Sequence, residues 1–107
     1  EWLAKFGEAD LLRSQSEADP WADKVRDAMR HTWAGYKKQA WGHDEVTPEG
    51  GRPKDWCGLA VTMLDGLSTL YVMGLRDEFN EAAEWLEQNP LPSPGQHGQF
   101  SLFEINI

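Results

Sequence analysis

The sequence predicts an all-α fold. Three observations point to it: segments in which apolar residues recur at helical spacing, clusters of glycine and proline between those segments, and only one short stretch with strand character, near residues 98–102. Of the 107 residues, 40% are apolar and 26% are charged, which are ordinary proportions for a globular protein. We therefore expect one small helical domain, or a part of a larger one.

The first clear helix is expected to begin at Asp19 and Pro20. An aspartate can accept hydrogen bonds from the free N–H groups of a helix start, and proline suits the first turn because its missing N–H is not needed there. Apolar residues then recur at helical spacing as far as Ala40, and Gly42 is a natural stop. Residues 1–20 have a weaker pattern and are treated as a lead-in segment without assignment.

Residues 43–54 are expected to form a loop, because two prolines and two glycines interrupt them. Asp55 is then expected to cap a second helix that runs from Trp56 to Met73 and ends at Gly74. Nearly every residue of this helix is apolar, and a helix that is apolar on all sides is buried on all sides. We therefore expect a central helix surrounded by others.

A third helix is expected over Arg76–Gln88, with three prolines after it. Residues 99–102 have the character of a short strand. Ser101 and Glu104 have the spacing of a capping box, in which a serine and a glutamate bond reciprocally to free N–H groups at a helix start. A fourth helix would begin there, close to Ile107, and we therefore interpret the chain as an excerpt of a larger domain.

Charge and cysteine content narrow the possible functions. Ten Lys and Arg residues against eighteen Asp and Glu residues give a formal net charge of −8, so we expect no nucleic-acid partner, which would need clustered positive charge. The helix expected over residues 56–73 is long enough to be mistaken for a membrane span, but Asp65, Gly66, Ser68 and Thr69 in its middle argue against one. The single cysteine, Cys57, excludes an internal disulfide and is expected to act as a small apolar filler.

Six tryptophans are unusual in a chain of this length. A domain this small buries only about 60–65% of the surface of its unfolded chain, so hiding six indoles would be difficult. Either this surface meets the rest of a larger fold, or some aromatic side chains line a ligand groove, where stacking on sugar rings would be one use.

Asp65 and Glu104 are the carboxylates with the most potential for chemistry. Asp65 lies in the apolar helix, where a charge is costly unless it is paired or functional. Asp65 would either bond to Thr62, Ser68, a buried arginine or a backbone group, or serve a reaction. The capping box is the structural explanation of Glu104, and a catalytic role is the alternative.

A run of three polar residues, His43, Asp44 and Glu45, contains groups that can bind a metal or transfer a proton. Three adjacent polar residues in a loop are more often simply solvated, and we expect that here. His31 and His97 have no partner four residues away and do not suggest metal ligands.

Three segments follow one another along the chain: Val25–Tyr36 continued by Ala40–Glu45, then Gly58–Leu70, and finally Ser101–Glu104. In their residues, order and spacing they resemble the class I α-1,2-mannosidases, glycoside hydrolase family 47. The resemblance implies that residues 21–107 form the N-terminal portion of an (αα)7 barrel. It also implies a function: inverting, calcium-dependent removal of terminal α-1,2-linked mannose from high-mannose N-glycans in the secretory pathway (endoplasmic reticulum or Golgi lumen), or by a secreted protein.

The resemblance also implies roles for individual residues. Glu104 matches the general acid of the family, and Asp65 matches an acid near the sugar pocket. His43 and Asp44 are candidate substrate-binding residues. No metal ligand is expected in this chain, because the residues that bind calcium in the family lie downstream. The chain alone is therefore expected to be inactive without the remainder of the catalytic domain.

One departure from the family leaves a second interpretation open. Ser68 stands where the family often has a second aspartate, which removes a charge from the side of the pocket. A weakly catalytic, lectin-like relative that binds mannose-rich glycans in glycoprotein quality control is therefore the alternative. An unrelated helical interaction module is a third, more remote interpretation.

Overall fold

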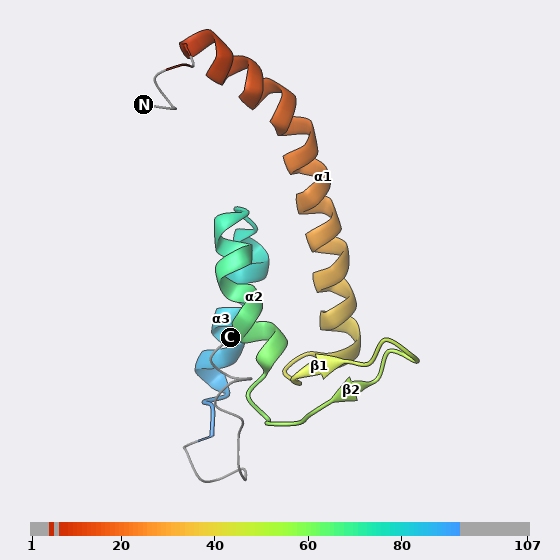
Figure 1. The fold of residues 1–107 in the computed structure, drawn as a ribbon. Helices are drawn as coiled ribbons and strands as arrows, with labels where there is room; N and C mark the ends of the chain where they lie inside the picture. Colours follow the sequence, from red (N-terminus) through yellow and green to blue (C-terminus); the bar gives the residue numbers. More distant parts are fainter. Residues whose placement is uncertain (1–4, 6, 93–107) are drawn as a thin grey trace. The chain divides into compact units, whose positions relative to one another are not determined.

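The computed structural model describes residues 5 and 7–92, and this part of the chain is mainly helical (Figure 1). It contains three α-helices and one pair of short strands: α1 (Glu8–Ala40), β1 (Glu45–Val46), β2 (Pro53–Lys54), α2 (Val61–Val72) and α3 (Arg76–Gln88). The predicted all-α class is confirmed. The strand expected near residues 98–102, the capping box and Glu104 lie outside the described residues. No helix in the described part combines the length and apolar character that crossing a bilayer requires.

The chain divides into two compact units, residues 1–32 and 33–107. In the first unit, α1 begins at Glu8, so the predicted helix start at Asp19 and Pro20 is wrong, and Pro20 lies inside the helix. The carboxylate of Asp10 accepts the N–H of Gly7 at 3.2 Å and so caps the true start. Residues 8–19 are rich in good helix formers, and their combined propensity outweighs the one hydrogen bond that a proline removes.

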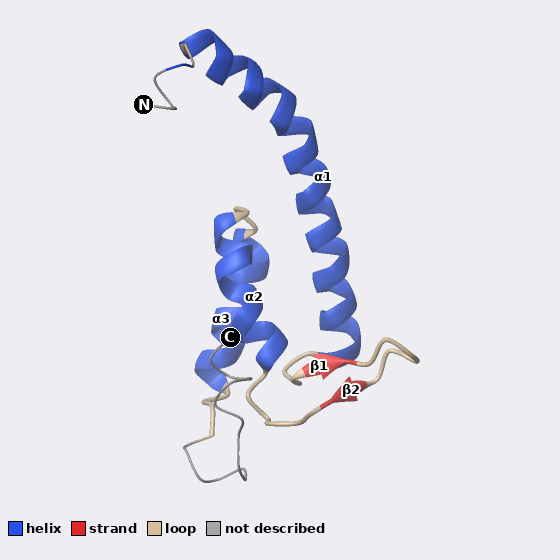
Figure 2. Ribbon diagram, viewed as in Figure 1, coloured by secondary structure: helices blue, strands red, loops and turns tan. Residues whose placement is uncertain are grey.

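In the second unit, the end of α1 is followed by a short hairpin (Figure 2). β1 and β2 pair antiparallel, with Glu45 opposite Lys54 and Val46 opposite Pro53. An ion pair of 3.0 Å between Lys54 Nζ and Glu45 Oε1 crosses the two strands. The loop predicted over residues 43–54 therefore contains a small sheet, whose two-residue strands are too short to show an alternating pattern.

α2 begins at Val61, five residues later than predicted, and Asp55 does not cap it. The residue before it, Ala60, has a left-handed backbone with φ 49°, and residues 56–60 form a loop. The C-terminal end follows the prediction. Gly74 adopts φ +75°, and the N–H of Leu75 bonds to the carbonyl of Leu70 at 2.9 Å, which is the usual glycine-dependent helix stop.

The predicted burial of the second helix on all sides is wrong for this chain. Met63 and Leu70 are buried, but Tyr71 is 52% exposed and Val72 is 84% exposed. Within residues 33–92, α2 packs beside α3 (Figure 2) and meets the end of α1. These two neighbours cover only part of its surface, so apolar side chains remain in contact with solvent.

α3 has the predicted bounds and packs close to the end of α1. Lys37 forms an ion pair with Glu81, and the indole of Trp85 lies against the turn at Gly42. A Cβ atom added to Gly42 would lie 2.3 Å from the Cζ2 atom of Trp85. Only glycine therefore fits this turn, whose φ of +80° also disfavours other residues.

Replacing Gly42 by alanine is expected to destabilise the protein by about 2–4 kcal/mol, from the collision with Trp85 and the strained backbone. Thermal unfolding of the full-length protein that contains this chain would measure the loss. Gly35→Ala is the matched control, because Gly35 lies inside α1 with nothing within 4 Å of an added Cβ, and it should stabilise the protein slightly. Equal melting temperatures for the two variants would contradict the close packing.

Candidate functional site

Asp44 is completely buried between the end of α1 and the start of α2, and both of its carboxylate oxygens accept backbone hydrogen bonds. The expectation of a solvated loop is wrong for this residue. Oδ2 accepts the N–H groups of Trp56, Cys57 and Gly58 at 2.9, 2.7 and 2.7 Å. Oδ1 accepts those of Leu59 at 2.8 Å and Val61 at 3.4 Å.

The backbone conformation of the loop explains this arrangement. Gly58 has φ +69° and Ala60 has φ 49°, and such left-handed residues turn successive N–H groups toward one point, where an anion is stabilised. Burial alone would raise the pKa of the Asp44 carboxyl. The N–H bonds from Cys57 and its neighbours outweigh burial and hold that pKa well below its usual range. Asp44 is therefore charged and fully hydrogen-bonded in the interior.

The backbone of Asp44 is also bonded on both sides. Its carbonyl oxygen accepts the backbone N–H of Thr62 at 2.9 Å and the hydroxyl of Thr62 at 2.7 Å. Its N–H donates to Oδ1 of Asp55 at 3.0 Å, and the other oxygen of Asp55 lies 2.7 Å from Nδ1 of His43. His43 and Asp55 are both about half exposed, so they form the solvent-facing edge of the cluster.

Tyr36 pins the turn that leads into this cluster. Its hydroxyl donates to the carbonyl of His43 at 2.9 Å and accepts the N–H of Gly42 at 3.2 Å. Burial, with a smaller contribution from nearby Asp44 and Asp55, raises the pKa of Tyr36 to about 12. The ring also packs against Trp33 and Trp41, with centroids 5.4 and 5.9 Å away. The turn is thus held by both hydrogen bonds and aromatic packing.

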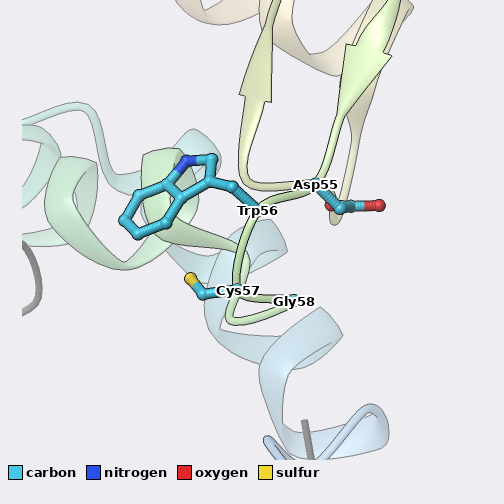
Figure 3. Close-up of a pocket in the computed structure, with 4 residues that line it drawn as sticks. All are labelled: Asp55, Trp56, Cys57 and Gly58. Atoms are coloured by element: carbon cyan, nitrogen blue, oxygen red, sulfur yellow. The ribbon is translucent and has the colours of Figure 1, made fainter. Parts of the chain in front are cut away.

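An open pocket of about 400 Å³ lies against the same loop, lined by Asp55, Trp56, Cys57 and Gly58 (Figure 3). Figure 3 shows the Trp56 indole and the Cys57 thiol on one side of the loop and the Asp55 carboxylate on the other. Cys57 is buried, and burial raises the pKa of its thiol. This agrees with the predicted role as an apolar filler, since a raised pKa opposes formation of a reactive thiolate.

The sequence predicts two further site residues, Asp65 and Glu104. Asp65 lies in the middle of α2 and is exposed, so its expected burial in an apolar helix is wrong for this chain. Glu104 is outside the described residues. Among residues 5 and 7–92, no group of three His, Cys, Asp or Glu side chains is placed to hold a metal ion.

The sequence predicts His43 and Asp44 as candidate site residues, but it does not predict that Asp55, the loop over residues 56–59 and Thr62 bond to Asp44. Local patterns instead favour Asp55 as the cap of a longer helix, and that expectation is wrong.

Comparisons with known proteins agree on one family. The model of glycosyl hydrolase family 47 matches residues 28–107. The endoplasmic reticulum mannosyl-oligosaccharide 1,2-alpha-mannosidase of Rattus norvegicus is 45% identical over 65 residues, which cover 61% of this chain and 10% of that protein. The mannosyl-oligosaccharide 1,2-alpha-mannosidase MNS3 of Arabidopsis thaliana is 40% identical over 97 residues, which cover 86% of this chain and 16% of that protein. The chain therefore spans only a small part of the length of these relatives.

Proposed function

This chain belongs to glycosyl hydrolase family 47, and we propose that it is the N-terminal portion of the catalytic domain of a 1,2-alpha-mannosidase. The whole protein would remove terminal mannose from high-mannose N-glycans. The observation that carries this proposal is the family match over residues 28–107, together with relatives that are named mannosyl-oligosaccharide 1,2-alpha-mannosidases. The remainder of the catalytic domain would be supplied by segments that follow this chain.

Two carboxylates of this chain would serve the reaction. Glu104 would act as the general acid that protonates the departing glycosidic oxygen, and Asp65 would lie beside the sugar as a pocket acid. An inverting mechanism uses two separated carboxyl groups with room for a water molecule between them. The exposure of Asp65 on α2 supports its proposed role as a pocket acid. A side chain at the surface of this segment can face a pocket that other segments complete.

His43 and Asp44 would contribute to substrate binding in different ways. His43 is about half exposed and is oriented by Asp55, so its ring can contact a glycan hydroxyl. Asp44 has no exposed surface, and its oxygens are occupied by backbone N–H groups. Its contribution would come from ordering the loop that carries Trp56 rather than from a direct contact with sugar.

Calcium would be held by residues downstream of this chain. The secretory pathway is the proposed location, in the lumen of the endoplasmic reticulum or Golgi or after secretion. Support comes from the relatives in rat, mouse and human that are named as endoplasmic reticulum enzymes.

A lectin-like relative with weak or no hydrolysis is the second candidate. Ser68 favours it, because this residue lies exposed on α2, three residues after Asp65, where the family often has another acid. Loss of that charge would weaken catalysis more than it weakens the binding of a neutral sugar.

The two candidates are separated by incubating the full-length protein with a fluorescently labelled high-mannose N-glycan and following the release of mannose by chromatography. We expect stepwise loss of α-1,2-linked residues, which stops in a metal chelator and resumes when calcium is added. Binding of the glycan without release would favour the lectin-like candidate. If the protein neither binds the glycan nor releases mannose, both candidate functions are contradicted.

A further inference from the structure

We propose that Asp44 and Thr62 form a clamp that positions Asp65 for the reaction, an inference that rests on the proposed mannosidase function. The clamp consists of the two bonds from Thr62 to the carbonyl of Asp44, at 2.9 Å from the backbone N–H and 2.7 Å from the hydroxyl, and of the bond from the Val61 N–H to the Asp44 carboxylate at 3.4 Å. Asp44 and Thr62 are positioning residues, because Asp44 is completely buried and the hydroxyl of Thr62 is bonded to the carbonyl of Asp44.

The clamp replaces the cap that α2 lacks. The residue at the N-cap position is Ala60, whose methyl side chain accepts no hydrogen bond, and α2 has no side-chain cap. The first N–H groups of a helix need acceptors, and an uncapped start is poorly ordered. Here a residue from before the hairpin supplies the acceptors, so the start of α2 is capped by Asp44 rather than by a side chain of its own sequence.

The position of Asp65 follows from the helix geometry. Thr62 and Asp65 are three residues apart, and residues with this spacing are neighbours on one side of a helix. The clamp therefore holds the turn that carries Asp65. Asp44 is itself fixed, since it is completely buried and its N–H is bonded to Asp55. A rigid support of this kind is needed because small errors in the placement of a reacting group reduce rates strongly.

Thr62→Val is the sharpest test, because it removes the hydroxyl bond and keeps the shape of the side chain. In the full-length enzyme we expect kcat on a high-mannose glycan to fall about tenfold while KM changes little. Thr62→Ser keeps the hydroxyl and should restore kcat. Thr32→Val is the matched control, because it removes a hydroxyl bond of 2.9 Å to the carbonyl of Ala28 at an exposed helix position, and it should leave kcat unchanged.

A double-mutant cycle distinguishes positioning from a general structural role. If Thr62 acts through Asp65, the combined variant Thr62→Val, Asp65→Asn should lose no more activity than Asp65→Asn alone. Losses that multiply would overturn the proposal, because they would show that Thr62 acts independently of Asp65. An unchanged kcat in Thr62→Val would overturn it as well.

Hydrogen exchange provides a readout that does not depend on activity. Amides of residues 61–65 should exchange about tenfold faster in Thr62→Val than in the wild-type protein or Thr62→Ser, while those of α3 keep their rates. If the wild-type protein releases no mannose, the proposed function fails, and this measurement still decides whether the clamp orders α2. Unchanged exchange at residues 61–65 would overturn the clamp.

Discussion

Replacing Glu104 by glutamine in the full-length protein is expected to lower turnover of a natural high-mannose glycan by roughly 10²–10⁴-fold, with an unchanged melting temperature. Glutamine has nearly the shape of glutamate and can still accept the hydrogen bond of a capping box. It has no acidic proton, so it cannot protonate the departing mannoside oxygen. The loss would therefore be specific to catalysis.

The comparison substrate for this variant is a mannoside with an activated leaving group. Such a substrate needs less protonation as the bond breaks, so Glu104→Gln should retain a larger share of the wild-type rate on it. If Glu104 is only the third residue of a capping box, stability would change by no more than about 0.5 kcal/mol, and activity would follow stability. An unchanged rate on the natural glycan would refute the catalytic role.

Replacing Asp44 by asparagine is expected to destabilise the protein by about 3–5 kcal/mol, as measured by denaturant unfolding. The carboxylate accepts five backbone N–H groups in a buried position, and an asparagine would turn an NH₂ group toward some of these donors. Buried donors without an acceptor are costly. Asp19→Asn is the control, because Asp19 is exposed on α1. This substitution should leave the free energy of unfolding nearly unchanged.

The pH dependence of stability would show whether the loss of stability in Asp44→Asn comes from the charge of Asp44. Because the pKa of Asp44 is lower in the folded protein than in the unfolded chain, its stabilising contribution is complete above the unfolded value of about 4 and is lost as the pH falls below it. The difference in stability between the wild-type protein and Asp44→Asn should therefore shrink between about pH 5 and pH 3. A difference that stays constant over this range would argue against a buried, charged Asp44.

Local signals in the sequence predicted some elements well. The bounds of α3 and the stop at Gly74 follow from an amphipathic stripe and from a glycine with a left-handed backbone, both of which depend on neighbouring residues. The predicted start of α1 at Asp19 and Pro20 is wrong because the helix-forming residues before Pro20 extend the helix back to Glu8. A proline marks a helix start only when no helix already runs into it.

The start of α2 and the role of Asp44 could not be predicted from local patterns. Residues 56–59 donate their N–H groups to a carboxylate that is 12 to 15 residues away in the chain. Helix propensity and the spacing of apolar residues carry no information on such a distant acceptor. For the same reason, the burial of Asp44 could not be predicted from its polar neighbours, His43 and Glu45. The functional interpretation of Asp65 depended on family resemblance, because its chemistry alone allows both structural and catalytic roles.

The hydrogen bonds of Asp44 also suggest an order of assembly. Those that join it to Asp55, the loop and Thr62 span between 11 and 18 residues of the chain. Closing loops of this length costs less chain entropy than closing longer ones, and such contacts form faster than pairings between distant segments. During synthesis, these bonds can therefore form soon after Thr62 leaves the ribosome, before residues farther along the chain are available. We expect the start of α2 to serve as an early folding nucleus onto which later helices assemble.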